Sequence, residues 1–395
     1  MPFRRLSVTS LALSACASLF AAEPPLADVI QNALATSAQQ LEWQLAHLPA
    51  DSDKPMPRTF EHGKLVTVQT RDWTSGFFPG SLWYLFEATG DAKWRASAEK
   101  FTALLAPEQH NQRTHDVGFI LYCSYGNGLR LTGNVAYAEV LRNGAASLST
   151  RFRPKVGCIQ SWDKRRGWEC PVIIDNLMNL ELLLWAARDT KDDHFRAIAV
   201  SHADTTLKNH FRPDHSSFHV VDYDPATGAV RTRVTHQGTA DSSAWARGQA
   251  WGLYGYTVMY RETRDPRYLA QAQAIAAFMM NHPRLPADKV PYWDFDTPAI
   301  PDAPRDSSAA AVMCSALLEL RRYVEPAVAS KYSAFAEAQL RSLASPAYLA
   351  RPGENGGFLL KHATGNHPSK SEIDTPLNYA DYYFLEALLR ARAAN

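Results

Sequence analysis

This sequence has almost no net charge and few cysteines, and each of these two features argues against a class of function. The 41 lysines and arginines nearly balance the 40 aspartates and glutamates, which leaves a formal net charge of +1. A broad attraction to nucleic acid or to anionic lipid is therefore not expected, and no nucleic-acid partner is predicted. The 5 cysteines form no CxxC pair, which argues against a zinc site or a dense disulfide framework. Cys158 and Cys170 could pair in an oxidising compartment, but free buried thiols are the simpler expectation.

The motifs of several common chemistries are missing as well. No HExxH or comparable spacing of histidines predicts a metal site, no glycine-rich loop predicts a phosphate site, and no serine stands in a nucleophile elbow. After residue 25 no apolar run is long enough to form a transmembrane helix. With 46% hydrophobic residues, the chain nevertheless has ample material for a large core.

Residues 1–22 have the composition of an export signal. Two arginines precede a short apolar stretch and several small residues, and this stretch is too short to span a bilayer permanently. Removal at Ala21 or Ala22 would release a secreted protein, whereas the motif LSAC fits a bacterial lipoprotein signal that is cleaved before an acylated Cys16. Either way we expect the mature protein outside the cytoplasm, in the periplasm or as an outer-membrane lipoprotein with a lipid anchor. Residues 23–395 are then predicted to form a single domain.

A phrase recurs along the remaining chain and predicts a helical repeat. It appears in the segments EATGDAKWRASAEK, RLTGNVAYAEVL, ARDTKDDHFRAIAV and RETRDPRYLAQAQ, whose threonines are Thr89, Thr132, Thr190 and Thr263. In each segment a short polar turn follows the threonine, an aromatic residue stands five positions after it, and an alanine-rich or polar helix comes next. Glycine, asparagine and aspartate in the turn are typical of the end of one helix and the cap of another. An apolar stretch of about 16 residues precedes every turn, so each repeat is a pair of helices.

The polarity of the paired helices predicts how the repeats pack. The helix before each turn is apolar nearly all round, which is typical of a helix buried on both sides, and the helix after it has a polar face. Repeated helical hairpins stack into a solenoid or close into a ring. Residues 314–343 supply a further hairpin, and a helix over 378–395 can pair with one over 27–48. We therefore predict an all-α fold, an (α/α)6 barrel of six hairpins with the apolar helices inside.

Four residues are predicted to meet at one end of this barrel. They lie 15 or 16 positions before the turn threonines and are Trp73, Asp116, Asp175 and Arg247. Because 16 helical residues span about 24 Å, all four side chains belong at the same end of the inner helices. Two neighbouring carboxylates in an apolar wall raise the pKa of one of them and create a proton donor. The simpler alternative is that both aspartates cap helices, although Trp73 and Arg247 at equivalent positions cannot cap.

A small β-hairpin is predicted to overhang the same mouth. The segments FHVVDY and VRTRV flank the turn sequence DPATG, just before the helix that carries Arg247. His219 on one arm and Gln237 beyond the other are candidate ligand-binding residues, or else ordinary polar residues of a hairpin. Arg247 and Trp251 are four apart on one helix face, where a guanidinium beside an indole suits a sugar carboxylate and a sugar ring.

The loop QSWDKRRGWECP, residues 160–171, leads to Asp175 and has two features of its own. Trp162 and Trp168 could stack on sugar rings. The run from Lys164 to Arg166 could attract an anionic acceptor sugar, although a solvated charged face is the commoner meaning of such a run. Both interpretations of the basic run stay open at this point.

Six motifs resemble those of a known family. In order along the chain they are RDWTSGFFPG, THDVGF, IIDNLMNLELL, HQGTADSSAWARGQAWGLYG, PRDSSAAA and DTPLNYADYYFLEALLR. They resemble the unsaturated glucuronyl hydrolases, glycoside hydrolase family 88, and the resemblance extends from about residue 30 to the carboxyl end. It implies an (α/α)6 barrel and a glycosidase without metal or organic cofactor. The implied substrates are oligosaccharides left by polysaccharide lyases, which carry a uronic acid with a C4=C5 double bond at the non-reducing end.

The resemblance also implies a role for each candidate residue. Asp175 in IIDNLMNL matches the general acid and base of the family, and Asp116 in THDVGF matches its second essential aspartate. The acid would protonate C4, water would add at C5, and the hemiketal would rearrange and release the acceptor sugar. The remaining matches are to substrate-binding residues: Trp73, Trp162, His219, Gln237, Arg247 and Trp251. Lys370 and Ser371 partly match a stretch of members that prefer sulfated fragments, so sulfate preference stays open.

Three other functions remain compatible with the sequence. An unsaturated rhamnogalacturonyl hydrolase shares the barrel and one acidic residue, so the pair of Asp116 and Asp175 favours the glucuronyl family. An inverting glycosidase on the same barrel would need a second carboxylate to activate water, with Asp294, Asp296 or Asp306 as candidates. A sugar-binding lipoprotein without catalytic activity would keep the tryptophans but would not need both Asp116 and Asp175.

Overall fold

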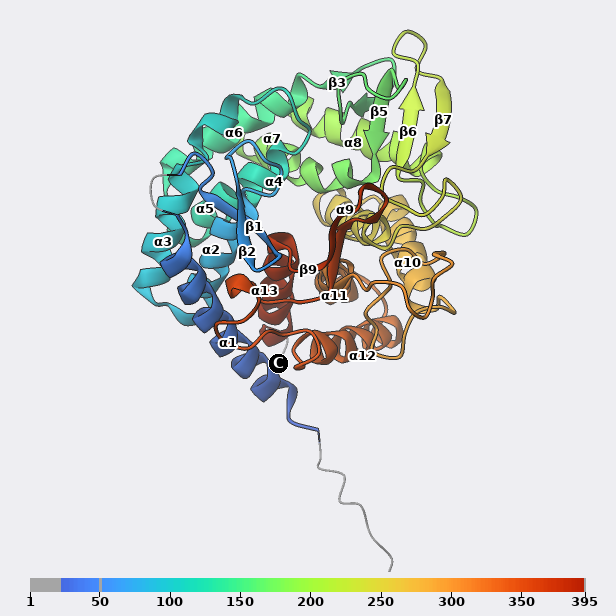
Figure 1. The fold of residues 1–395 in the computed structure, drawn as a ribbon. Coiled ribbons are helices and arrows are strands. Elements are labelled where there is room, and N and C mark those ends of the chain that lie inside the picture. The colour runs from blue at the N-terminus through green and yellow to red at the C-terminus, as the bar shows by residue number, and fades with distance from the viewer. Residues whose placement is uncertain (1–22, 50–51, 394–395) are drawn as a thin grey trace, which may run out of the picture.

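The helices of the computed structural model form two concentric rings (Figure 1). The structure describes residues 23–49 and 52–393, so the predicted signal over residues 1–22, with Cys16, lies outside the described residues. The inner ring consists of α2 (Phe77–Thr89), α4 (Val117–Leu121), α5 (Asn127–Thr132), α7 (Leu180–Thr190), α9 (Ala246–Thr263), α11 (Ser307–Leu320) and α13 (Asn378–Arg392). The outer ring consists of α1 (Leu26–His47), α3 (Ala92–Ala103), α6 (Val135–Ser149), α8 (Asp193–Asn209), α10 (Pro266–Met280) and α12 (Pro326–Leu343).

The inner helices close into a ring because each packs against the next. A π-helical turn, Tyr122–Gly126, joins α4 and α5 into one inner unit, which lies between α2 and α7. A 3₁₀ helix, Ile174–Asn179, precedes α7 and packs against α9. α11 then joins α9 to α13, and α13 also contacts α2, while α1 covers α13 from outside. The predicted (α/α)6 barrel is confirmed.

Burial follows the difference in polarity between the two kinds of helix. Every residue of α11 is buried, and α9 is buried continuously over Ala246–Met259. The outer helix α3 buries only one face, which consists of Trp94, Ala98, Phe101 and Thr102. Each large apolar side chain removed from water in this way stabilises the fold by about 1.5–3 kcal/mol. The core therefore lies in and between the two rings.

The four turn threonines all make the same two hydrogen bonds. Each Oγ1 donates to the carbonyl oxygen four residues earlier at 2.6–2.7 Å and accepts the N–H two residues later at 3.2–3.3 Å. The residue after each threonine has left-handed backbone angles, and these residues are Gly90, Gly133, Lys191 and Arg264. The following residue, an aspartate or asparagine, accepts a backbone N–H and so caps the outer helix. The repeat in the sequence is therefore a repeated turn in space.

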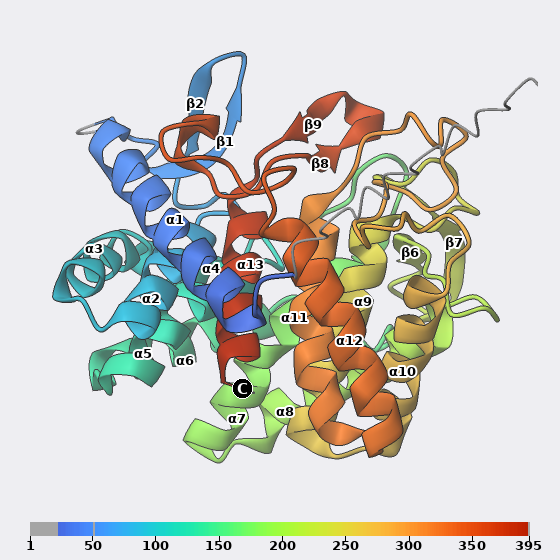
Figure 2. The same ribbon diagram turned by 90° about the horizontal axis from the view of Figure 1, so that it is seen from below.

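The predicted hairpin forms and is part of a larger sheet. β6 (Val220–Tyr223) and β7 (Val230–Val234) pair antiparallel, and β5 (Cys170–Ile173) adds a third strand next to β6. Three further hairpins were not predicted: β1 (Met56–Glu61) with β2 (Lys64–Val68), β3 (Phe152–Arg153) with β4 (Cys158–Ile159), and β8 (Ala363–Asn366) with β9 (Ser371–Thr375). These strands are short and polar in part, so they lack the alternation that signals a strand. β1, β2, β8 and β9 project from one end of the ring (Figure 2).

The structure also tests whether Cys158 and Cys170 pair and whether any helix could cross a membrane. All four cysteines in the described part of the chain are buried and free, so Cys158 and Cys170 do not form a disulfide. Over residues 23–49 and 52–393, no helix combines the length and the apolar composition that crossing a bilayer requires.

Candidate active site

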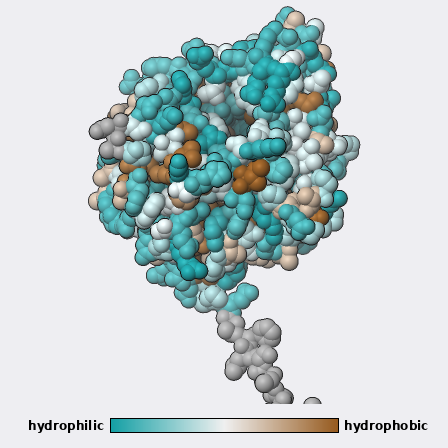
Figure 3. All heavy atoms as spheres, in the orientation of Figure 1, coloured by the Kyte–Doolittle hydropathy of each residue, from teal (hydrophilic) through white to brown (hydrophobic). Residues whose placement is uncertain are grey.

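The four residues that the repeat brings into register do gather at one end of the inner ring. Trp73 precedes α2 and Asp116 precedes α4. Asp175 lies in the 3₁₀ helix before α7, and Arg247 lies in the first turn of α9. This end faces the viewer in Figure 1, with the hairpins β1–β2 and β8–β9 in front of it. The space-filling view of the same face is hollowed near the middle of the ring (Figure 3).

Neither aspartate caps a helix. Asp116 stands at the N-cap position of α4, and Asp175 lies in the first turn of the 3₁₀ helix, but no capping hydrogen bond is made at either helix. The carboxylate of Asp116 instead accepts a hydrogen bond from Thr114 Oγ1 at 2.7 Å and lies 3.3 Å from His115 Nε2. The capping alternative is therefore wrong, and both carboxyl groups are available for another purpose.

Burial makes Asp175 a weak acid. Its side chain is 12% exposed, and the loss of hydration raises the pKa of Asp175 from 3.8 to about 7. The positive charge of Arg247 acts in the opposite direction on this pKa, and the negative charge of Asp116 raises it further. A large fraction of Asp175 is therefore protonated at neutral pH, as a general acid requires.

His219 faces this acid in a fixed tautomer. Its Nδ1 accepts the backbone N–H groups of His236 and Gln237 at 3.1 and 3.0 Å, so Nδ1 carries a lone pair. Burial lowers the pKa of His219, which keeps the ring neutral and leaves its single proton on Nε2. Nε2 lies 3.7 Å from Asp175 Oδ2, which is too far for a normal hydrogen bond.

Three buried polar atoms at this place have no partner among the described residues. They are Asp175 Oδ2, His219 Nε2 and Trp251 Nε1. The indole N–H of Trp251 is near enough to Asp175 to lower its pKa, although its geometry falls short of a full hydrogen bond. Buried polar groups in folded proteins usually have a hydrogen-bond partner, which is another protein group, a water molecule or a ligand. One carboxyl oxygen and two N–H donors are therefore prepared for a polar ligand.

Arg247 is held by the protein, and its surroundings differ from the expectation. Its guanidinium pairs with Asp306 Oδ2 at 2.9 Å and donates to the two carbonyl oxygens of Thr364 and Gly365 at 2.6 and 2.5 Å. It lies 4.6 Å above the ring of Trp245 instead of beside the Trp251 indole. Arg247 therefore clamps β8 onto α9 and supplies positive charge to Asp175.

Trp73 and Trp251, the two tryptophans of the mouth, differ in which of their atoms a ligand can reach. Trp251 is fully buried, with its ring against Phe119 and Tyr383, so only its N–H can reach a ligand. Trp73 is partly exposed and rests on Phe119 and on Tyr379, at ring distances of 5.6 and 4.9 Å. Trp73 can therefore stack on a sugar ring, whereas Trp251 cannot.

The remaining candidates lie on the loops and hairpins around the mouth. Trp162 is partly buried, and its ring lies 6.2 Å from that of His219. Gln237 donates from Nε2 to the Gly365 carbonyl at 2.9 Å and so ties the loop after β7 to β8. Lys370 and Ser371 are exposed at the turn between β8 and β9, and no described contact joins them to the catalytic pair.

Residues that the sequence did not single out complete the site. Trp245 and Tyr379 enclose the Arg247 guanidinium, and His236 holds the His219 tautomer. All three stand inside quoted motifs or next to a named candidate, so proximity along the chain was the available signal. Nothing in the pattern distinguished them from other aromatic residues, because their role depends on contacts that form only in the folded chain.

The alternative carboxylates have structural partners. Asp294 Oδ2 accepts hydrogen bonds from Thr239 N and Ser243 Oγ, and Asp296 accepts one from a backbone N–H. Asp306 caps α11 and also pairs with Arg247. Asp294 and Asp306 are buried and engaged, so neither is left to activate water, and Asp296 is exposed. Among the described residues no three His, Cys, Asp or Glu side chains group in a way that could hold a metal ion.

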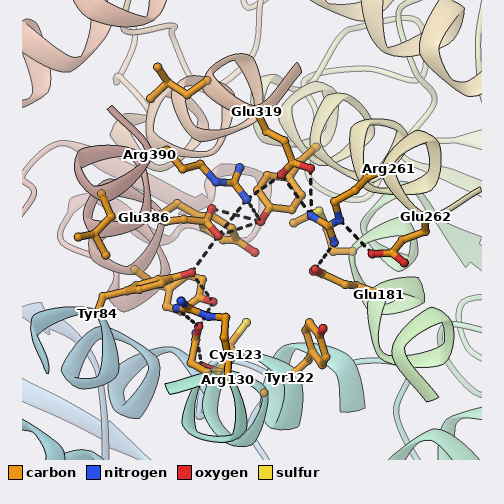
Figure 4. A pocket seen from close by; sticks show the side chains of 18 of the residues that line it. Tyr84, Tyr122, Cys123, Arg130, Glu181, Arg261, Glu262, Glu319, Glu386 and Arg390 are labelled. Atoms are coloured by element: carbon orange, nitrogen blue, oxygen red, sulfur yellow. Dashed lines mark hydrogen bonds and ion pairs between the residues drawn. The ribbon is translucent and has the colours of Figure 1, made fainter. Parts of the chain in front are cut away.

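A separate cavity of about 1080 Å³ opens at the other end of the ring, among the C-terminal halves of the inner helices (Figure 4). Its charged groups pair with one another across helices. Glu386 of α13 accepts hydrogen bonds from Tyr84 and Tyr254, and Arg261 of α9 pairs with Glu319 of α11. No polar side-chain atom of this lining is among the buried atoms that lack a partner. The cavity therefore differs in kind from the mouth around Asp175.

Comparison with known proteins bears on the family of this barrel. The sequence model of Glycosyl Hydrolase Family 88 matches residues 51–383, which is most of the chain. The chain belongs to glycoside hydrolase family 88. It is therefore a glycosidase, and the family 88 fold is the barrel described above.

Members of family 88 resemble the chain over nearly its whole length. An unsaturated glucuronyl hydrolase from Formosa agariphila is 52% identical over 325 residues, which cover 82% of this chain and 80% of that protein. An unsaturated chondroitin disaccharide hydrolase from Streptococcus agalactiae is 33% identical over 367 residues, 91% of each protein. The crystal structure of an unsaturated glucuronyl hydrolase specific for heparin is 51% identical and superposes with a TM-score of 0.89, over 93% of this chain and 98% of that one.

Proposed function

We propose that this family 88 enzyme removes a 4,5-unsaturated uronic acid from the non-reducing end of oligosaccharides produced by polysaccharide lyases. The observation that carries the proposal is Asp175, a buried acid with a pKa of about 7 whose Oδ2 has no partner within the protein. Such a group can protonate a carbon–carbon double bond, which a hydrated and ionised carboxylate cannot. The names of the relatives, unsaturated glucuronyl hydrolase and unsaturated chondroitin disaccharide hydrolase, support the same substrate class.

The reaction needs one group that first gives a proton and then accepts one. Protonated Asp175 gives its proton to C4, and the electron pair of the double bond forms the new C4–H bond. Positive charge then develops on C5 and the ring oxygen, where the fixed carboxylate of Asp116 stabilises it. Asp175, now ionised, takes a proton from the water that adds to C5. The hemiketal rearranges and releases the acceptor sugar, so no second catalytic carboxylate is needed at C1.

The unpartnered N–H groups hold the sugar while this happens. His219 Nε2 and Trp251 Nε1 can each donate to a sugar oxygen beside Asp175, because neither donor is taken by the protein. His219 must stay neutral for this role, since a second proton on Nδ1 would meet the two backbone N–H groups that point at it. Trp73 provides an aromatic face for the uronate or its neighbour.

Export is part of the same proposal and depends on residues 1–22 alone. Their arginines, short apolar stretch and small residues support a location outside the cytoplasm, and LSAC supports a lipid anchor at Cys16. An exported enzyme would meet lyase products before or during their uptake.

Absorbance measures the proposed reaction directly, because the conjugated double bond absorbs ultraviolet light and its hydration removes the signal. Purified protein should decrease the ultraviolet absorbance of lyase-generated unsaturated disaccharides. Asp175→Asn should keep the fold and bind substrate but lose at least about 100-fold in kcat, the usual contribution of a general acid. The matched control is Asp302→Asn, the same change at an exposed position, which should leave kcat unchanged.

Two results would contradict the proposal. Near-normal turnover by Asp175→Asn would remove Asp175 from the chemistry. Release of sugar from saturated glycosides, without bleaching of any unsaturated disaccharide, would identify an ordinary glycosidase instead. A panel that includes an unsaturated rhamnogalacturonan disaccharide separates the proposal from that neighbouring specificity.

A further inference from the structure

A short basic loop stands beside the catalytic residues. Trp162 and Trp168 stack across it with ring centres 6.0 Å apart, and Arg166 and Gly167 make the tight turn between them with left-handed backbone angles. Arg165 and Arg166 are both exposed on this turn. The stacked pair thus fixes where the two guanidinium groups lie.

The acids of the loop are already paired with other residues. Asp163 pairs with Arg151 at 3.1 Å, and Glu169 pairs with Lys164. In the part of the chain that the structure describes, neither Arg165 nor Arg166 has a carboxylate within ion-pair distance. The turn therefore carries two positive charges that the protein itself does not neutralise.

Both guanidinium groups are connected to the catalytic centre through one intervening residue each. Arg165 lies 4.6 Å above the ring of Trp162, which lies beside His219. Arg166 donates to His236 Nδ1 at 2.8 Å, and the backbone N–H of His236 holds the tautomer of His219. Two side chains, Trp162 or His236 and then His219, therefore separate the turn from Asp175.

The two like charges on this exposed turn repel each other. Burial and the neighbouring charge of Arg166 both lower the pKa of Arg165. An anion bound between the two groups would offset this repulsion, and guanidinium groups match the planar or tetrahedral oxygens of a carboxylate or sulfate. The aromatic rings beneath them suit the sugar that carries such an anion.

We infer that Arg165 and Arg166 bind a sulfate or carboxylate on the acceptor sugar, so that the preferred substrates are unsaturated disaccharides with an anionic acceptor. The inference rests on the proposed function, and it assigns the anion to the acceptor for a geometric reason. The unsaturated ring must lie against buried Asp175, so the acceptor extends outward, toward the exposed turn. Lys370, on a separate hairpin, is not needed for this contact.

Three unsaturated disaccharides test the inference, with a neutral acceptor, a sulfated acceptor and a carboxylated acceptor. Wild-type kcat/KM should be about tenfold higher for at least one anionic acceptor, and added salt should reduce this preference. The double variant Arg165→Ala/Arg166→Ala should lose that preference, measured as the ratio of kcat/KM for the anionic acceptor to kcat/KM for the neutral acceptor. Comparing the two anionic arms identifies whether sulfate or carboxylate is recognised.

The loop offers a matched control. Lys164→Ala removes one positive charge from the same turn, but this charge is paired with Glu169, so the preference should remain. Equal losses for neutral and anionic acceptors in the double variant would indicate a structural role and overturn the inference, as would a wild-type enzyme that prefers the neutral acceptor. Wild-type activity on the neutral acceptor with no effect of the variants refutes this inference alone, whereas inactivity on all three refutes the proposed function as well.

Discussion

Asp175 gives the enzyme a proton donor and at the same time lowers its stability at neutral and alkaline pH. An ordinary aspartate is ionised above pH 3.8, and the folded protein resists that ionisation until about pH 7. The same missing hydration that keeps the proton on Asp175 makes its ionised form unfavourable in the fold. The neighbouring neutral His219 follows this pattern, because burial lowers its pKa and removes a second charge from the site.

Replacing this acid should stabilise the protein above pH 7. Folding raises the pKa of Asp175, so its favourable contribution is present at low pH and is lost as pH rises from about 4 through about 7. Asp175→Asn does not titrate, and its free energy of unfolding should exceed that of the wild type by up to about 4 kcal/mol above pH 7. Thermal unfolding midpoints from pH 4 to 8 measure the difference. A constant difference across this range would show that Asp175 does not titrate with a raised pKa.

At the scale of elements, four of the connections from an inner helix to an outer helix use the same turn. Each inner helix must end and reverse within two residues, and the threonine hydroxyl, the left-handed residue and the capping aspartate or asparagine do this together. These contacts join residues close in sequence, so the pattern could be recognised without the fold. The strands around the mouth have no such local signature. β5 pairs with β6, which lies about fifty positions later, and the hairpin of β8 and β9 is held against α9 by Arg247, 117 positions from Thr364.

The left-handed position of these turns gives a matched pair of substitutions with opposite signs. Gly90 has open space where a Cβ would stand, so Gly90→Ala tests only the backbone and should destabilise by about 1 kcal/mol. Lys191 occupies the equivalent position in another turn with an exposed side chain, and Lys191→Gly should stabilise by a similar or smaller amount. Urea unfolding measures both. Destabilisation by both changes would mean that the turns are not equivalent.

At the scale of the whole molecule, the two ends of the ring have different tasks. The N-terminal ends of the inner helices leave polar atoms without partners, and the C-terminal ends pair theirs across the cavity of Figure 4. Glu386 shows the second pattern, because it accepts hydrogen bonds from α2, α9 and α11 and pairs with Arg390 of its own helix. Buried groups satisfied in this way hold the ring together while the opposite mouth stays open to substrate.

Removing this cross-link should affect stability and leave catalysis intact. Glu386→Ala leaves three hydroxyl donors without their acceptor and removes one of the carboxylates that pair with Arg390. This change should lower the free energy of unfolding by about 3–5 kcal/mol. The folded fraction should keep its kcat/KM within about twofold. Glu87→Ala, which breaks an exposed pair with Arg130, is the control and should cost less than about 1 kcal/mol. A large loss of kcat/KM in folded Glu386→Ala would show that the two ends are coupled.

The sequence by itself determined the barrel and the placement of Asp116 and Asp175 at one of its ends, because turn and helix signals act between residues a few positions apart. The tertiary structure alone decided which polar groups form hydrogen bonds or ion pairs within the protein and which have no partner there. Arg247 was expected to bind substrate, and the structure engages both of its terminal guanidinium nitrogens with Asp306 and β8. Within the described part of the chain only its Nε lacks a partner, as do Asp175 Oδ2 and His219 Nε2. Hydration and pairing depend on everything packed around a group, and the partners of Arg247 come from segments more than fifty positions away.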